Sequence, residues 1–304
     1  MCNLSNPIYH DADKAREHLE AIRWPDGPIC PHCGVIGDHY SLNGKAHRAG
    51  LWKCKDCRKQ FSVTVGTVFE RSKVPLNKWL LAVHLLTSSK KGYSAHQLHR
   101  NLGVTYKTAW FMAHRIRHAM ENTDSSLMGS GGGTVEADET YIGRKKDTPI
   151  KAGWKHKQAV FTLVERGGKA RSFKIPGRAF DTIKAELFKN VSTDAHLMTD
   201  MLSAYNRLGK HFASHERVNH GEHEYVRGNA HTNTIESYFS VFKRGMKGVY
   251  QHCSEDHLHR YLAEFDFRYN HRTALEIDDK ERSDAALKAI QGKRLTYRQS
   301  GGRA

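Results

Sequence analysis

Two pairs of cysteines form the clearest metal-binding pattern in the sequence. Cys30 and Cys33 enclose Pro-His, and twenty residues later Cys54 and Cys57 enclose Lys-Asp. Two such turns bring four thiolates around one tetrahedral ion, a geometry that Zn²⁺ prefers. Redox-active cysteine pairs are the alternative, but no β-α-β pattern surrounds either pair. We therefore expect a zinc ribbon in which these four cysteines hold a structural Zn²⁺.

Acidic side chains near the ends of expected strands form a second group of candidates. Residues 134–143 are expected to form a strand in which Glu136 and Asp138 share one face, and residues 195–200 form another that ends at Asp200. Hard divalent cations such as Mg²⁺ prefer carboxylate oxygens. Two such ions about 3.5–4 Å apart clamp the attacking and leaving oxygens of a phosphoryl transfer. These residue types thus point to metal-dependent chemistry on phosphate esters.

The helix expected at residues 233–247 adds polar groups to this set. Apolar residues such as Ile235 and Phe242 form one stripe, whereas Asn233, Glu236 and Lys243 lie on another face. Spacings of three and seven residues bring these three side chains close together along the helix axis. Glu236 is therefore expected to have an amide one turn before it and a cation two turns after it. An ordinary amphipathic helix is the alternative for this segment taken alone.

A helix-turn-helix unit is expected in the first half of the chain. Residues 75–86 have apolar side chains at helical spacing, Ser94 starts a helix that stops at Gly103, and Thr105 caps another. In such units the start of the second helix faces base edges and neighbouring cations contact phosphates. A plain three-helix packing unit is the alternative. The residues expected at the DNA are Tyr106, Lys107, Thr108, Arg115 and Arg117.

The charge of the chain favours a polyanionic partner. The 304 residues have a formal net charge of +16, and residues 71–120 contain nine Lys and Arg but no Asp or Glu. A basic excess of this kind attracts nucleic acid. No apolar run approaches the roughly 20 residues of a membrane span, and four acids among the first twenty residues argue against a signal peptide. Because four of the six cysteines lie in the close pairs, a secreted disulfide framework is not expected.

The order of these features predicts an α+β multidomain chain. Three expected strands, a helix and further strands ending in carboxylates suggest an RNase H-like mixed α/β sheet. The run Ser-Ser-Leu-Met-Gly-Ser-Gly-Gly-Gly resembles a flexible connector. The expected domains are an N-terminal helix with the four-cysteine zinc ribbon (1–70), the helix-turn-helix segment (71–122), a Gly/Ser linker (123–133), the RNase H-like catalytic domain (134–275) and a C-terminal tail (276–304).

Over roughly residues 10–275, the chain resembles DDE-type insertion-sequence transposases with an N-terminal zinc ribbon, members of the RNase H-like superfamily of retroviral integrases. Six stretches match in the right order, and together they are specific although each alone is not. They are CPHCG from Cys30, QFSVTVGTVF from Gln60, EADETYIG from Glu136, MTD from Met198, HTNTIESYFSVFKRG from His231 and RYLAEFDFRYNHR from Arg260.

The resemblance implies roles for individual residues. Asp138, Asp200 and Glu236 match the three acids that bind two Mg²⁺ or Mn²⁺ ions, with 35 residues between Asp200 and Glu236. Lys243 matches the helper lysine, and Asn233 stands where the group has an asparagine. Two alternatives stay open, because Glu136 and Glu139 flank Asp138, and because Asn233 could replace Glu236 as the metal-side group. The implied activity is cleavage of the 3′ ends of an insertion sequence, followed by strand transfer.

The resemblance also implies partners and a location. The partners are DNA with terminal inverted repeats, target DNA and a second copy of the chain, with no membrane involved. The expected location is the cytoplasm of a prokaryotic host, in association with the nucleoid.

Other functions are kept open. They are a zinc-ribbon and helix-turn-helix DNA-binding regulator with an inert RNase H-like domain, a nuclease of the same fold, and a decayed transposase copy. A run of histidines is interpreted as solvated or phosphate-facing rather than as a second metal site; it comprises His211, His215, His220, His223 and His231.

Overall fold

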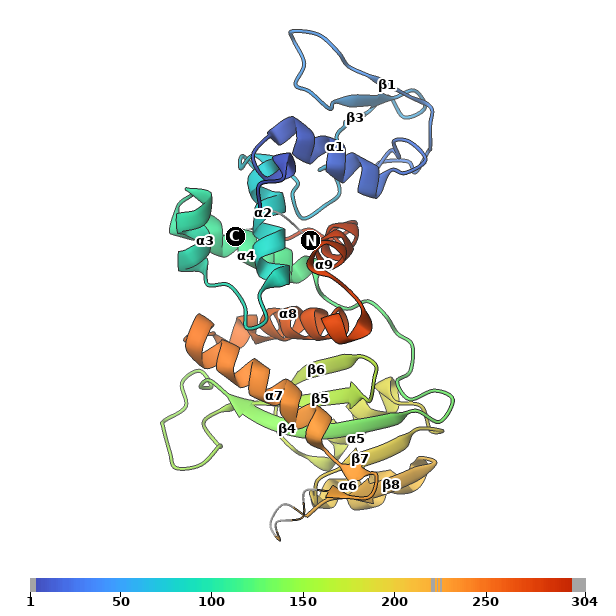
Figure 1. Cartoon of the computed structure of the whole chain (residues 1–304), viewed down its shortest axis with the longest axis vertical. Helices are drawn as coiled ribbons and strands as arrows, with labels where there is room; N and C mark the ends of the chain where they lie inside the picture. The colour runs from blue at the N-terminus through green and yellow to red at the C-terminus, as the bar shows by residue number, and fades with distance from the viewer. Residues whose placement is uncertain (1–3, 220–221, 223, 225, 297–304) are drawn as a thin grey trace. The chain divides into compact units, whose positions relative to one another are not determined.

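The computed structural model describes residues 4–296 except 220, 221, 223 and 225, and the chain falls into two compact units (Figure 1). The first unit takes in the chain up to Ser89, Tyr93–Met120 and the chain from Ile277 onward. The second consists of Lys90–Gly92 and Glu121–Glu276. In the part of the chain that the structure describes, no helix has the length and apolar character needed to cross a membrane.

The first unit begins with a helix and a small ribbon. Helix α1 (Ala12–Arg23) starts at the predicted cap, because Asp11 Oδ1 accepts hydrogen bonds from the backbone N–H groups of Asp13 and Lys14. An antiparallel three-stranded sheet follows, which confirms the predicted ribbon. Its strands, in spatial order, are β1 (His39–Ser41), β2 (Trp52–Cys54) and β3 (Gln60–Phe61).

Three helices follow the ribbon, and the last two form the expected helix, turn and helix. Ser94 forms a capping box with Gln97, Gly103 ends the same helix in the left-handed conformation at φ 57°, and Thr105 caps the next helix. Apolar faces that include Leu98 pack these helices together. The helices are α2 (Leu76–Ser88), α3 (Ala95–Leu102) and α4 (Tyr106–Ala119).

The segment that we expected to be a C-terminal tail contains a helix of the first unit. Helix α9 (Asp279–Lys288) packs on α1 and α2 and buries Leu287. Its Ser283 hydroxyl lies 3.2 Å from Nδ1 of the buried His84. The helix has few apolar residues, so its sequence gives only a weak amphipathic pattern, and its packing could not be predicted from that pattern. The chain therefore returns to its N-terminal unit after the sheet.

The second unit is built around a five-stranded mixed sheet in the order β6-β5-β4-β7-β8. The first three strands are antiparallel, whereas β4, β7 and β8 run parallel to one another. This arrangement agrees with the predicted RNase H-like domain. The strands are β4 (Thr134–Ile142), β5 (Gln158–Glu165), β6 (Ala170–Ile175), β7 (His196–Thr199) and β8 (Ser214–Arg217).

Helices cover both faces of this sheet (Figure 1). Side chains alternate along β5, so that Phe161 packs under one helical layer and Val160 under the other. One layer consists of α5 (Phe180–Asn190) and α6 (Ser203–Leu208), and the other of α7 (Asn233–Gly245) and α8 (Leu258–Asn270). Smaller elements are the hairpin of β9 (Val226–Arg227) and β10 (Ala230–His231), the π turn Met246–Tyr250, and 3-10 turns at Pro7–Tyr9, Gly209–His211, Glu255–His257 and Thr273–Leu275.

The glycine-rich stretch before β4 is anchored to the sheet domain, contrary to the flexible linker that we expected. The backbone N–H of the buried Met128 donates to Asn190 O at 2.8 Å, and Gly131 N donates to Asp194 Oδ2 at 2.7 Å. Gly129 has φ 73°, and a Cβ there would meet Ala195 Cβ at 2.5 Å. Glycine is thus needed here for close approach and a left-handed backbone as well as for chain freedom.

We predict that Gly129→Ala destabilises the sheet domain more than Gly131→Ala. Both glycines have positive φ, at 73° and 76°, but a Cβ at Gly131 has nothing within 4 Å. Gly131→Ala, the control, should therefore lower the free energy of unfolding only by the backbone cost of a left-handed alanine, about 1–2 kcal/mol. Gly129→Ala should lower it by about 1–3 kcal/mol more because of overpacking. Urea unfolding of the two variants measures the difference, and equal losses would contradict the packing argument.

Candidate functional site

The four cysteines of the ribbon converge as predicted. The Sγ atoms of Cys30 and Cys57 lie 3.7 Å apart and those of Cys33 and Cys54 lie 3.6 Å apart. All four sulfur atoms lie within 4.8 Å of one another. A tetrahedral ion with Zn–S bonds of about 2.3 Å requires sulfur atoms about 3.8 Å apart. The four thiols therefore fit a structural Zn²⁺.

Asp138 and Asp200 lie side by side because of the register between two parallel strands. Ala137 of β4 pairs with Thr199 of β7, and each aspartate is the next residue in its chain. Neighbouring strands are about 4.8 Å apart, so the two backbones place these carboxylates close together. Asp138 Oδ1 accepts from the following backbone N–H at 2.6 Å, and Asp200 Oδ1 accepts from Leu202 N at 2.9 Å. Both carboxylates are thus oriented by local backbone donors.

A buried carboxylate, Glu136, attaches helix α7 to the same strand. Glu136 is fully buried, and its Oε2 accepts from the backbone N–H of Ile235 at 2.9 Å. Its Oε1 accepts from Thr234 Oγ1 at 2.9 Å and from Arg166 Nε at 2.7 Å. The contacts with Ile235 and Thr234 lie in the first turn of α7, next to Glu236, whereas Arg166 follows β5. Glu136 shares its face of β4 with Asp138, so it holds the start of α7 on that face.

Electrostatics link the three predicted acids. Burial raises the pKa of Asp138 to about 8, and the negative charges of Asp200 and Glu236 add to the rise. A buried carboxyl group of this kind resists ionisation by itself, but a divalent cation beside it stabilises the ionised carboxylate. The set of oxygen donors therefore fits Mg²⁺ or Mn²⁺ in its chemistry.

The carboxylates do not converge as closely as the cysteines. In the described ranges of the chain, only the four cysteines bring ligand atoms from three or more residues within 4.8 Å of one another. Mutual repulsion of like charges gives a physical reason for this spacing, because a cation is needed to offset it. Glu236 Oε1 instead lies 3.2 Å from Thr232 Oγ1, which donates to it.

The other two predicted residues of α7 lie along the helix from Glu236. Asn233 is the first residue of α7 and is exposed. Lys243 is half-buried, with its Nζ 5.7 Å from the centre of the Phe239 ring. Seven residues of helix rise about 10 Å, so Lys243 lies too far along the helix for its backbone to flank the same ion as Glu236.

Two further residues lie beside the acids. Glu139 was already visible in the sequence as an acid that flanks Asp138, whereas Tyr205 was missed. Tyr205 of α6 is fully buried, and its hydroxyl donates a hydrogen bond to Glu139 Oε1. Burial raises the pKa of Glu139 to about 7, although that hydrogen bond opposes the rise. Glu139 is one of the two acids that flank Asp138 in the sequence. Nothing local distinguishes Tyr205 from an ordinary core tyrosine.

The predicted DNA-facing residues of α4 separate into two groups. Tyr106 and Lys107 are exposed at the start of the helix, and Thr108 is half-buried beside its cap, Thr105. The prediction of phosphate contacts by Arg115 and Arg117 is corrected, because these side chains are only 8% and 2% exposed.

The buried position of Arg115 has a clear structural role. Arg115 Nη1 donates to Glu70 O at 3.2 Å, and Arg115 Nε donates to Leu295 O at 3.1 Å. The guanidinium thus connects segments of the first unit, one of which lies near the C-terminal end of the chain.

The histidines of the run that the structure describes do not form a common cluster. His220 and His223 lie outside the described residues. His215 Nε2 lies 2.9 Å from Thr199 Oγ1, and burial lowers the pKa of this histidine to about 4. His231 Nδ1 lies 3.0 Å from Arg166 Nη2, beside the Glu136 carboxylate. The described members therefore support the sheet and the anchor of α7, and His211 alone among them is exposed.

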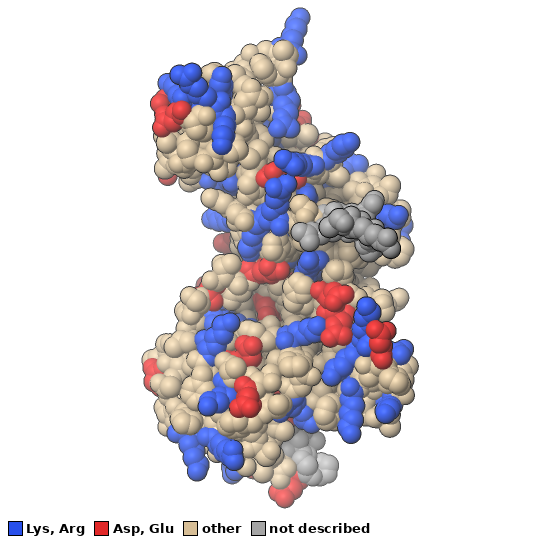
Figure 2. Space-filling model, turned by 180° about the vertical axis from the view of Figure 1, so that it is seen from behind, with Lys and Arg blue, Asp and Glu red and all other residues tan. Residues whose placement is uncertain are grey.

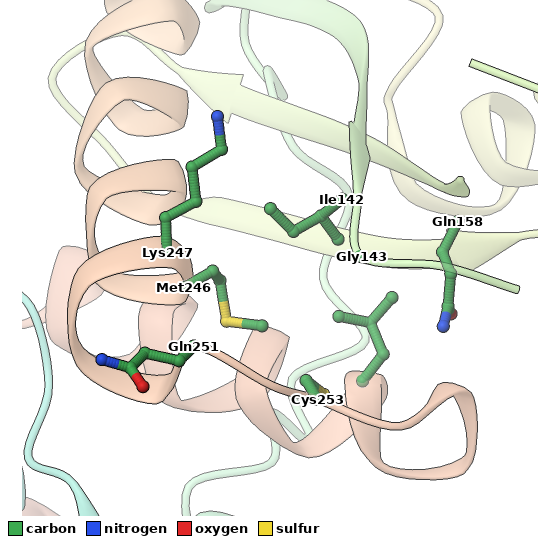
Figure 3. A pocket seen from close by; sticks show the side chains of 8 residues that line it. Ile142, Gly143, Gln158, Met246, Lys247, Gln251 and Cys253 are labelled. Carbon is green, nitrogen blue, oxygen red and sulfur yellow. The ribbon is translucent and has the colours of Figure 1, made fainter. Parts of the chain in front are cut away.

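A small cavity of the second unit lies away from the predicted acids. It has a volume of about 150 Å³ and lies between the end of β4 and the turn that follows α7 (Figure 3). None of the residues predicted to be catalytic lines it. The lining residues are Ile142, Gly143, Gln158, Met246, Lys247, Gln251, Cys253 and Leu258.

We predict that the ribbon requires its metal to fold. Purified protein should contain one zinc ion per chain, and Cys54→Ser should lose the ion and unfold the ribbon, because binding free energy of about 10–16 kcal/mol becomes folding energy. Elemental analysis and limited proteolysis measure both effects. Cys253→Ser is the matched control, since this cysteine is not part of the cluster. Zinc retained at full stoichiometry in Cys54→Ser would contradict the assignment.

Comparison with known proteins supports both parts of this description. Residues 131–270 match the ISXO2-like transposase domain, and residues 10–60 match the transposase zinc-ribbon domain. A protein of Halobacterium salinarum (strain ATCC 700922 / JCM 11081 / NRC-1), described as an uncharacterized protein in transposable element ISH50, is 33% identical over 273 residues, which cover 84% of this chain and 90% of the relative. The four-cysteine ribbon and the RNase H-like sheet agree with these matches, and the chain belongs to the family of ISXO2-like transposases.

Proposed function

We propose that this chain cuts the 3′ ends of an insertion sequence and joins them to target DNA, with Asp138, Asp200 and Glu236 as its catalytic acids. The observation that carries the proposal is the pairing of Ala137 with Thr199, which sets Asp138 beside Asp200. The attachment of α7 to β4 through Glu136 brings Glu236 to the same face.

The three acids would hold two Mg²⁺ or Mn²⁺ ions. Bound ions of this kind stabilise the negative charge that develops on a phosphoryl group and help to activate the attacking oxygen. Asp138 would be the ligand shared by both ions, since the charges of both Asp200 and Glu236 act on its carboxylate. Asn233 stays an alternative to Glu236 as the third metal-side group, because both residues lie in the first turn of α7.

The reaction consists of two phosphoryl transfers at the same site. Water attacks the phosphate at the end of the element, the bond from phosphorus to the 3′ oxygen breaks, and a free 3′-hydroxyl remains. That hydroxyl then attacks a phosphate of the target DNA and displaces its 3′ oxygen. Each step exchanges one P–O bond for another, so no covalent enzyme intermediate is required. Lys243 would contact a phosphate or the terminal base of the bound strand.

The first unit would bind the terminal inverted repeats. Tyr106, Lys107 and Thr108 at the start of α4 are candidates for base contacts, since the second helix of such a unit enters the major groove. The charge supports a DNA partner, because 48 Lys and Arg stand against 32 Asp and Glu. Figure 2 shows Lys and Arg spread over one face of the molecule, with Asp and Glu in smaller groups.

Transfer of two ends requires that both be held together, so we propose a homodimer in the active complex. The place of action would be the nucleoid in the cytoplasm of a prokaryotic host. A DNA-binding regulator with an inert sheet domain is the competing function, and a nuclease of the same fold is another. Retention of all three acids favours the transposase over both the regulator and a decayed copy.

We predict that Asp138→Asn, Asp200→Asn and Glu236→Gln each lower cleavage of labelled element-end DNA in Mg²⁺ by more than about 100-fold. Changes around a metal site commonly cost 10–100-fold even when they affect only its outer partners, and loss of a direct ligand should cost more. Binding of the end DNA, measured by gel shift, should stay unchanged because the first unit is untouched.

Glu216→Gln is the matched control, since Glu216 is an exposed carboxylate on the neighbouring strand β8. This variant should cut normally. Wild-type protein that binds the ends without cutting them would favour the regulator, and 3′ cuts without joined products would favour the nuclease.

A further inference from the structure

The loop between β4 and β5, residues 143–157, is strongly basic. It contains six Lys and Arg residues and a single acid, Asp147. Arg144, Lys146, Lys151 and Lys155 are exposed, and within the described residues none of the six lies in an ion pair. Figure 1 shows this long loop beyond the arrowhead of β4. A concentration of unpaired cations of this kind is suited to a phosphate backbone.

An aromatic residue of this loop presents one open face. The rings of Trp154 and Tyr141 stack with their centres 5.0 Å apart and an interplanar angle of 28°. The guanidinium carbon of Arg178 lies 4.9 Å from the Trp154 ring centre and 5.6 Å from that of Tyr141. If Arg178 lay on the opposite face of the indole, its distance from Tyr141 would be nearly twice as long. Both neighbours are therefore on one side of Trp154, and the side chain stays 42% exposed.

The position of this aromatic group relates it to the predicted acids. Tyr141 follows Asp138 by three residues on β4, about 10 Å along an extended strand, so the two side chains leave opposite faces of the sheet. That distance corresponds to roughly three nucleotides of a DNA strand at 3.4 Å each. Arg178 lies close enough to Glu139, the residue after Asp138, to act on its carboxylate electrostatically. A DNA strand whose phosphate lies at Asp138 would therefore reach Trp154 by passing around the end of β4.

We propose that Trp154, supported by Tyr141 and Arg178, is a stacking platform for an unpaired base of the DNA strand near the reacting phosphate. The base would stack on the open face of the indole, and the loop lysines would neutralise the adjacent phosphates. The inference rests on the proposed function, because that function places the DNA strand at Asp138. Flat aromatic faces flanked by cations bind single strands in this way, with little sequence preference.

The test separates base stacking from charge. Binding of fluorescein-labelled dT15 is compared, by fluorescence anisotropy without added Mg²⁺, with binding of a 15-residue oligonucleotide whose central residues are abasic. The Kd of wild-type protein for dT15 should be roughly 10- to 100-fold lower than its Kd for the abasic oligonucleotide. This ratio corresponds to the stacking free energy of one or two bases. Trp154→Ala should abolish most of this preference, whereas Trp154→Phe should keep most of it.

Two controls make the result specific to the indole. Ile150→Ala removes another exposed apolar side chain of the same loop, 72% exposed, and should keep the preference for dT15. The double variant Lys151→Gln and Lys155→Gln should weaken binding of both oligonucleotides equally. An unchanged preference in Trp154→Ala would overturn the proposal, as would equal binding of both oligonucleotides by wild type, which would indicate a purely electrostatic or protein-binding loop.

The outcome is independent of catalysis. Strand binding that depends on Trp154 would support the platform even if Asp138→Asn and Asp200→Asn cut normally, in which case the assignment of the acids fails by itself. Normal cleavage by a Trp154→Ala protein that also binds dT15 like wild type would overturn the platform and leave the assignment of the acids intact.

Discussion

The pairing of β4 with β7 is the constraint on which the rest of the site depends. Parallel neighbours in fixed register bring Asp138 and Asp200, which are 62 positions apart in the sequence (200 − 138), to adjacent positions. A shift by one residue would turn one of these carboxylates to the other face of the sheet. Register is held by the packed layers on both faces, where Ala137 and Leu197 are fully buried. The chemistry of the site is therefore set by ordinary core packing.

Glu136 fixes the position of the first turn of helix α7 relative to β4. A buried carboxylate is costly unless its oxygens are satisfied, and here they accept from a backbone N–H of α7, from Thr234 and from Arg166. The negative charge at the start of the helix also interacts favourably with the helix dipole. The stretch from Glu136 to Glu139 thus contains three acids in different surroundings. Glu136 is buried and anchors α7, Asp138 lies beside Asp200, and Glu139 accepts a hydrogen bond from Tyr205.

Elements that depend on residues close together in the sequence could be predicted well. Caps at Asp11, Ser94 and Thr105 and the spacing of the cysteines lie within a few residues of the structures they form. Contacts between distant segments could not be predicted in this way. The burial of Arg115 depends on Leu295, some 180 residues away, and the packing of α9 depends on helices at the other end of the chain. The same limit applies to the site, since no local pattern distinguishes the anchor Glu136 from a ligand.

The central claim is that Asp138, Asp200 and Glu236 together bind divalent cations. The most direct measurement is a crystal structure of the protein with Mn²⁺, with the ion located by its anomalous scattering. The account predicts density in contact with both Asp138 and Asp200, and with Glu236 or Asn233 as the third group. Mn²⁺ that binds elsewhere, with these two aspartates free of metal at saturating concentration, would contradict it.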